Sequence, residues 1–77
     1  MTWTWREKTI SNAGELFNAA NACHTQDDAD DFLTAYRAVS EHADANLGYV
    51  IGYGDAATRK RLYDLFRLGH PVYGRAV

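Results

Sequence analysis

The residues that follow Thr25 constrain the fold more than any other part of the chain. Apolar or small side chains recur there at intervals of three and four, which is the pattern of a helix with one buried face. They are Ala29, Phe32, Leu33, Tyr36, Val39, Ser40 and Ala43. Thr25 can cap the helix, and Asp27 and Asp28 fall in the first turn, where the helix dipole favours acidic groups. The pattern predicts a helix from Gln26 to Glu41, with Asp28 as the acidic member of a capping box.

Two weaker stripes predict one helix before this segment and one after it. The upstream stripe consists of Ala13, Leu16, Phe17, Ala20 and either Cys23 or His24. Its expected N-cap is Ser11 or Asn12. The downstream stripe consists of Thr58, Leu62, Leu65, Phe66 and Leu68, after a cap at Asp55. Gly69 followed by His70 and Pro71 is the usual order of a helix stop, so we expect the downstream helix to end there.

The segment from Ala45 to Tyr53 fits either a helix or a strand. A helix from Ala43 to Tyr53 has two stripes: small residues with one tyrosine (Ala45, Gly48, Tyr49, Gly52) and apolar residues (Leu47, Val50, Ile51). Two glycines weaken such a helix by roughly 1–2 kcal/mol, which favours a close helix–helix contact at the small-residue stripe. In a strand, Leu47, Tyr49, Ile51 and Tyr53 alternate with other residues. We favour the helix, because only residues 2–5 and 72–73 are candidate pairing partners for such a strand.

These patterns predict an all-α fold, a compact bundle of three to four short helices with extended aromatic segments at both ends. The end segments are TWTW and PVYG, and each can cover apolar surface of the helices. The alternative is an α+β fold with a small two- or three-stranded sheet. Seventy-seven residues are enough for one domain, so residues 1–77 are expected to form a single unit.

Several classes of chemistry find no support in the sequence. Cys23 is the only cysteine, so neither an intramolecular disulfide nor a thiolate zinc cluster can form. The run from Gly52 to Ala57 matches a dinucleotide-binding fingerprint, but too few residues follow it to build the fold that this motif requires. No Gly-Lys pair is present for a phosphate-binding loop. We therefore expect no enzyme activity, no catalytic, cofactor-binding or metal site, and no cofactor.

The chain is expected to be a cytoplasmic protein that does not enter a membrane. Its start, MTWTWREK, lacks the apolar region of a secretory signal. The longest mostly apolar run, from Ala45 to Gly54, is about half of the ~20 residues that a membrane-spanning helix needs.

Binding to a protein is the function that the composition favours. Aromatic residues are 13% of the chain, and tryptophan, tyrosine and arginine are the residues that most often anchor protein interfaces. The candidate interaction surface consists of Trp3, Trp5, Tyr49, Tyr53, Arg59, Tyr63 and Arg67. The partner is expected to be another protein or a second copy of the chain. For Trp3 and Trp5 an equally weighted interpretation is that they close the core of a small domain.

Weak nucleic-acid binding is the alternative function. Residues 55–77 carry five basic side chains against two acidic ones, and a helix would align Arg59, Tyr63 and Arg67 at intervals of four. Residues 11–54 carry seven acidic side chains against Arg37 alone, and the sequence pI is about 5.8. DNA-binding modules usually have a pI above about 9, so the composition argues against nucleic acid. A solvated face with a Lys60–Asp64 pair is the simpler interpretation of the basic run.

The chain also resembles a group of small proteins encoded by bacteriophages of mycobacteria and related actinobacteria. The resemblance rests on the segments WREKTI, EHADANLGYVIGY and GHPVYG, and it extends from Trp5 to Gly74. The chain departs from the group at Val72 and Tyr73, where isoleucine and phenylalanine are usual. The resemblance implies a protein that acts in the cytoplasm of an infected bacterium by binding host or phage proteins. It assigns no functional residues.

Overall fold

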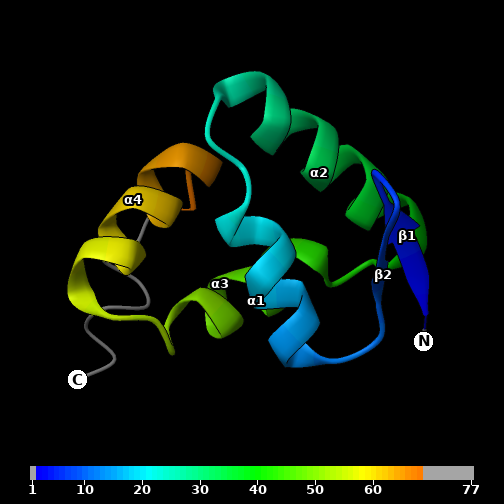
Figure 1. Cartoon of the computed structure of the whole chain (residues 1–77), viewed down its shortest axis with the longest axis horizontal. Helices are drawn as coiled ribbons and strands as arrows, with labels where there is room; N and C mark the ends of the chain where they lie inside the picture. The colour runs from blue at the N-terminus through cyan, green and yellow to red at the C-terminus, as the bar shows by residue number, and fades with distance from the viewer. Residues whose placement is uncertain (1, 69–77) are drawn as a thin grey trace.

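The computed structural model describes residues 2–68, which form four helices and one two-stranded antiparallel sheet. In chain order the elements are β1 (Trp3–Trp5), β2 (Lys8–Ile10), α1 (Ala13–Asn21), α2 (Gln26–Val39), α3 (Ala43–Ile51) and α4 (Ala56–Phe66). The predicted compact bundle of short helices is confirmed, and the small sheet of the alternative is present as well (Figure 1). The predicted aromatic segment PVYG and the predicted helix stop from Gly69 to Pro71 lie outside the described residues.

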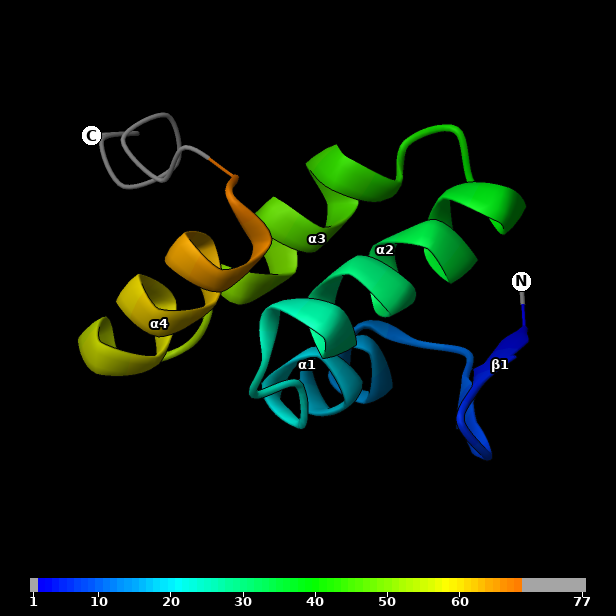
Figure 2. The ribbon, with the colours of Figure 1, turned by 90° about the horizontal axis from the view of Figure 1, so that it is seen from above.

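The two strands form a hairpin that lies against α2, at the end of the molecule away from α4 (Figures 1 and 2). Trp3 pairs with Ile10, and Trp5 pairs with Lys8. Because side chains alternate across a strand, Trp3, Trp5 and Ile10 all turn to the core while the residues between them are exposed. The turn places Arg6 at φ 49° and Glu7 at φ 70°, which is the left-handed region usually occupied by Asn and Gly in two-residue hairpin turns.

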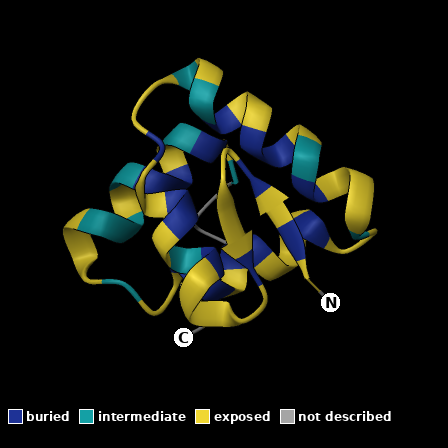
Figure 3. Ribbon diagram, turned by 45° about the vertical axis from the view of Figure 1, so that its right-hand side comes forward, coloured by how far each residue is buried: buried dark blue, intermediate teal, exposed yellow. Residues whose placement is uncertain are grey.

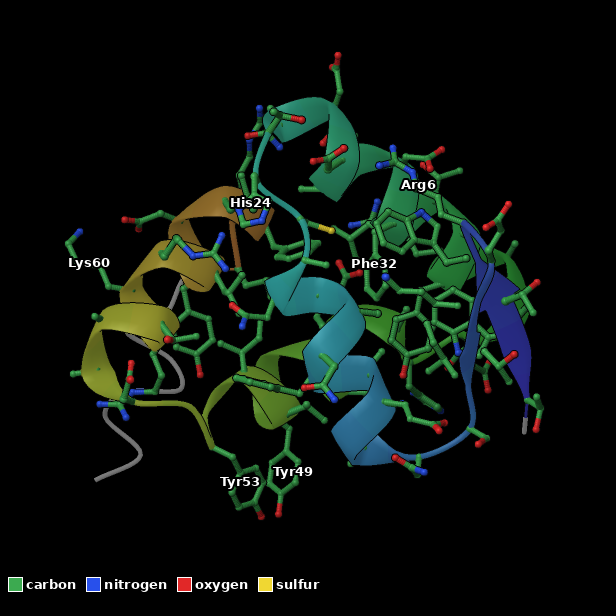
Figure 4. All side chains as sticks on the ribbon, in the orientation of Figure 1. Arg6, His24, Phe32, Tyr49, Tyr53 and Lys60 are labelled. Atoms are coloured by element: carbon green, nitrogen blue, oxygen red, sulfur yellow. The ribbon has the colours of Figure 1, made fainter. Side chains whose placement is uncertain are left out.

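Helix α2 supplies the centre of the core. Its predicted capping box is present: the Thr25 side chain accepts a hydrogen bond from the Asp28 amide, and the Asp28 carboxylate accepts one from the Thr25 amide. Phe32 is fully buried, and its ring lies 4.9 Å from that of Trp5 and 5.7 Å from that of Phe66 (Figure 4). This helix ends at Val39, two residues before the predicted end.

The segment for which the sequence allowed either a helix or a strand forms helix α3. Its apolar stripe of Leu47, Val50 and Ile51 is buried, as predicted. The small-residue stripe is only partly a contact face. Gly48 is buried, whereas the other residues of the stripe, Ala45, Tyr49 and Gly52, are exposed. The helix ends at Ile51, earlier than the predicted Tyr53, and the chain then turns toward α4.

The remaining helices begin at predicted caps. Asn12 caps α1 by accepting a hydrogen bond from the Glu15 amide, and Asp55 caps α4 by accepting one from the Thr58 amide. The end of α4 differs from the prediction. Arg67, at φ 57° and ψ 47°, is the left-handed residue that terminates the helix, two residues before Gly69. A left-handed residue closes the last turn by redirecting the chain, and a backbone hydrogen bond from Leu68 to the Tyr63 carbonyl completes this turn.

The four helices and the hairpin enclose one core. Figure 3 shows buried residues on the inward side of each helix and exposed residues on the outward side. Helix α3 packs against α1, α2 and α4, so it is covered on several sides, while its remaining side faces solvent. Among residues 2–68, no helix is long and apolar enough to cross a membrane.

Candidate interaction surface

Three of the predicted surface aromatics belong to the core instead. Trp3, Trp5 and Tyr63 expose only 7%, 5% and 3% of their surface. The Trp3 ring stacks on Tyr36 with 4.8 Å between ring centroids, and the Trp5 ring meets Phe32 edge-on. The interpretation of the two tryptophans as core residues is therefore correct. Their alternation along β1 is the reason, because it places both indoles on the side of the hairpin that faces α2.

Tyr63 is not part of an exposed face with Arg59 and Arg67. Its hydroxyl lies 3.1 Å from the Gly48 carbonyl oxygen and donates a hydrogen bond to it across the contact between α4 and α3. Arg67 is exposed at the end of α4, and Arg59 is half-buried. The predicted alignment at intervals of four holds along the helix, but the middle side chain turns to the core.

The basic run of α4 binds groups within the chain. The Arg59 guanidinium donates a 2.8 Å hydrogen bond to the Gly54 carbonyl, and the Lys60 ammonium lies 3.0 Å from the Asp64 carboxylate. The Arg61 guanidinium donates a 2.8 Å hydrogen bond to the Cys23 carbonyl. It also donates hydrogen bonds to two oxygen atoms of Asn21, the backbone carbonyl and the side-chain amide oxygen. These cations tie α4 to its own turn and to the end of α1, and Arg61 acts as a structural link rather than as a free surface charge.

Tyr49 and Tyr53 are the predicted aromatic residues that remain on the surface. They expose 66% and 74% of their area, more than any other large apolar or aromatic side chain in the described chain. Their rings meet edge-to-face with centroids 5.4 Å apart, and their hydroxyl oxygens lie 2.8 Å apart. The hydrogen bond with Tyr49 raises the pKa of the Tyr53 hydroxyl above its ordinary value. Figure 4 shows both side chains together, directed away from the ribbon.

Two hollows bordered by α1 and α3 lie beside this tyrosine pair, and residues of the hairpin and of α2 also line the first. The first has a volume of about 270 Å³ and is bordered by Tyr49, and the second has a volume of about 320 Å³ and is bordered by Tyr53. Ala13 and Val50 line both hollows, so the two are adjacent. We call the exposed face that contains them the tyrosine surface; it comprises Ala13, Phe17, Asn18, Asn46, Tyr49, Val50 and Tyr53.

Helix α1 contributes to this surface in a way that the sequence did not predict. Phe17 was assigned to the buried stripe of α1, but it is half-buried and lines the second hollow. Gly54 lies under it: a Cβ atom at Gly54 would come within 3.2 Å of the Phe17 ring. The missing side chain therefore allows the phenyl ring to lie on the link between α3 and α4, where it forms one wall of the hollow.

The tyrosine surface is free of charge on the described part of the chain. Of the residues in 2–68 that line the two hollows, none is acidic or basic, although the chain contains 18 charged residues, eight basic and ten acidic. The polar groups there are side-chain amides and hydroxyls, such as those of Asn18, Asn46 and Tyr49, which both donate and accept hydrogen bonds. The surface suits a partner surface that is itself uncharged.

The side chains that commonly bind metal ions do not gather within residues 2–68. No cluster of three or more His, Cys, Asp or Glu side chains able to hold a metal ion occurs there. Cys23 is fully buried, and burial, with a smaller contribution from the Asp28 charge, raises the pKa of its thiol to about 11. A protonated, buried thiol is a poor nucleophile.

Comparisons with protein-family models, with curated proteins and with solved structures find no match for this chain. The surface chemistry described above is therefore the basis for assigning a function.

Proposed function

We propose that this chain is a non-enzymatic interaction module that binds another protein through the tyrosine surface. The observation that carries the proposal is the pair of exposed tyrosines, Tyr49 and Tyr53, placed beside two adjacent hollows. Tyrosine is enriched at interfaces because it offers a large rigid apolar ring and a polar hydroxyl at the same time. Following the resemblance in sequence, the partner is a host or phage protein in the cytoplasm of an infected actinobacterial cell.

The geometry of the tyrosine pair supports this assignment. The edge-to-face contact and the hydroxyl–hydroxyl hydrogen bond hold Tyr49 and Tyr53 against each other before any partner arrives. A side chain that is ordered in advance loses less conformational entropy on binding, which leaves more of the contact energy as affinity. Val50, exposed by only 7%, is part of the lining of both hollows and anchors the surface to the core.

Nucleic acid is the less favoured partner. The basic residues that suggested it are Arg59, Lys60, Arg61 and Arg67. The first three each contact an oxygen atom within the chain, whereas Arg67 is exposed. Phosphate binding would have to compete with these contacts, and replacing Arg61 would loosen the fold rather than remove a surface contact.

Affinity capture from host lysate tests the proposal when it is run with matched variants. Tyr49→Ala and Tyr53→Ala remove the exposed rings, whereas Val39→Ala shortens a 43% exposed side chain on α2 that lines neither hollow. We expect a captured protein to be lost with both tyrosine variants and retained with Val39→Ala. The captured protein is then purified and titrated with the three variants. Equal affinity for all of them would show that the tyrosine surface is not the binding site.

A further inference from the structure

We infer that the tyrosine surface also binds a second copy of this chain, forming a symmetric dimer. The inference rests on the proposed function, because it assumes that this surface binds protein, and it adds the identity of one occupant. In a two-fold symmetric dimer the same surface of both copies is buried, so the surface must complement itself in charge, in hydrogen bonding and in shape.

The charge requirement is met because the described lining of the two hollows contains no charged residue. Contacts between the lining residues of two copies bring no like charges together and bury no unpaired charge, which are the two main electrostatic penalties of an interface. The Glu15 carboxylate already accepts two hydrogen bonds from Ser11, which lines the first hollow. The contrast with the rest of the surface is large. Helix α2, for example, carries four exposed or half-buried aspartates between residues 27 and 31, and a symmetric contact through it would oppose acidic groups.

The hydrogen-bonding requirement is met by groups that both donate and accept. Asn18 and Asn46 provide side-chain amides, and Tyr49 and Tyr53 provide hydroxyls. Each type can pair with its own kind, as the bond between the two tyrosine hydroxyls already shows within one copy. A surface of donors alone, such as a cluster of arginines, could not satisfy itself in this way.

The shape requirement is met because projecting rings and hollows occur together. Tyr53 is the most exposed large apolar or aromatic side chain of the described residues, and it stands next to the hollow of about 320 Å³, with the hollow of about 270 Å³ alongside. A two-fold axis between two such surfaces can place the ring of one copy over a hollow of the other, and symmetry then makes the contact reciprocal.

The size of the molecule sets the expected strength of association. A standard interface buries about 800 Å² on each partner. That area would be a large share of a chain whose accessible surface is 4698 Å². The seven residues of the tyrosine surface are far fewer than the roughly 20–30 residues per side of a standard interface, so we expect a reversible dimer with a dissociation constant in the micromolar range or weaker.

Analytical ultracentrifugation of the full chain over a concentration series tests the inference. The average mass should rise from 8.6 kDa toward twice that value as concentration increases. Tyr53→Ala and Tyr49→Ala should weaken association at least tenfold, while Val39→Ala should leave it unchanged. Circular dichroism of each variant shows whether it remains folded. A mass that stays at 8.6 kDa up to about 1 mM protein overturns the inference, as does association that neither tyrosine variant weakens.

A nearly isosteric change to Asn46 gives a second test that does not shorten a side chain. Asn46→Asp adds one negative charge to the surface of each copy, close to the start of α3, where an acidic group does not disturb the helix. Association should weaken at low salt and recover in part at high salt, since salt screens the repulsion between the copies. Thr34→Asp, at an exposed position of α2, is the control and should not change association.

The two proposals fail in different ways. If the chain stays monomeric but Tyr53→Ala still abolishes binding of the captured partner, the dimer is excluded and the proposed function stands. If dimer formation depends on Tyr53 but binding of the captured partner does not, the partner binds to a different surface and the proposed function fails.

Discussion

The hydroxyl of Tyr63 donates a hydrogen bond to the backbone carbonyl of Gly48, with 3.1 Å between the two oxygen atoms. Gly52 lies beside the same contact, since a Cβ atom there would be 3.3 Å from the Tyr63 hydroxyl. Gly52, which caps the end of α3, therefore leaves room for a tyrosine of α4 rather than for the backbone of another helix. This contact fixes α3 on α4, and with it the position of the tyrosine surface.

Replacing Tyr63 by phenylalanine removes only the hydroxyl of this contact. The Gly48 carbonyl keeps its hydrogen bond from the Gly52 amide, so we expect the free energy of unfolding to fall by about 1 kcal/mol, the usual value for one hydrogen bond. Urea unfolding, monitored by circular dichroism, measures this change in the free energy of unfolding. In a double-mutant cycle, Gly52→Ala should cost less stability in the Tyr63→Phe background than in the original chain, because the alanine methyl group no longer meets the hydroxyl. Equal costs in both backgrounds would contradict the contact.

Arg61 should matter more to stability than its neighbour Lys60. Arg61→Ala removes hydrogen bonds to the Cys23 carbonyl and to Asn21 at the end of α1, and we expect a loss of about 1–2 kcal/mol. Lys60→Ala removes an exposed pair with Asp64 at i+4, which is worth at most about 0.5 kcal/mol. Thermal unfolding of the two variants side by side provides the comparison. A larger loss for Lys60→Ala would mean that Arg61 does not link the helices.

The hairpin should become less stable in acid because of Asp28. Its carboxylate accepts hydrogen bonds from the Arg6 guanidinium and from the His24 and Thr25 amides, and these lower its pKa below the ordinary value. The unfolded chain therefore takes up the proton first as the pH falls below about 4, and the stabilisation present at neutral pH is progressively lost.

The stability of Asp28→Asn compared with the original chain, measured from pH 7 to pH 2, checks this dependence. The variant should be less stable at neutral pH and should change less with acid. Asp27→Asn removes one charge from the same helical turn and serves as the control. If the stability of both variants falls with pH in parallel with that of the original chain, Asp28 is not the group responsible for the acid dependence.

The turn of the hairpin should accept glycine. Glu7 has a φ of 70°, a conformation that disfavours side chains with a Cβ atom by roughly 1–2 kcal/mol. Glu7→Gly relieves this strain but makes the unfolded chain more flexible, so we expect a net gain of about 0.5–1 kcal/mol. Thr9→Gly, within β2, is the opposite control and should destabilise the protein. A loss of stability for Glu7→Gly would mean that the Glu7 side chain has a role in the folded state.

The Cys23 thiol should react only when the protein unfolds. Its sulfur atom is fully buried, and its pKa of about 11 leaves little thiolate at pH 8. We expect alkylation by iodoacetamide to be at least about 100-fold slower in the folded protein than in urea. Mass spectrometry of the alkylated protein follows the reaction. Similar rates in both conditions would place the thiol on the surface.

Local signals predicted the helices, and long-range contacts explain the differences. The cap at Thr25 and the apolar spacing of α2 lie within one segment, so the sequence was sufficient for them. Strand β2, Lys8–Ile10, has only three residues and was missed because a period of two cannot be recognised over that length. Its pairing with β1 depends on a tight turn that contains neither Gly nor Asn. The end of α4 at Arg67 was missed for a related reason, since the left-handed residue is again not the glycine.

The candidate site was predictable only in part. Tyr49 and Tyr53 were among the residues proposed for the surface, and they are exposed. Tyr63 was proposed with them but is buried, because its hydroxyl bonds to the Gly48 carbonyl and Gly52 has no side chain to obstruct that hydroxyl. The contribution of Phe17 depends on the contact of α1 with Gly54, 37 positions later in the chain. No local pattern records such a contact.

Both tryptophans pack around a single residue, since the indoles of Trp3 and Trp5 each lie within 5.5 Å of the Phe32 ring by centroid distance. Intrinsic indole emission therefore reports on the hairpin and the middle of α2, and it is blind to changes confined to the other side of the molecule. Circular dichroism, by contrast, averages over all four helices. Agreement between the two signals during unfolding would show that the hairpin and the helices come apart together, as one cooperative unit.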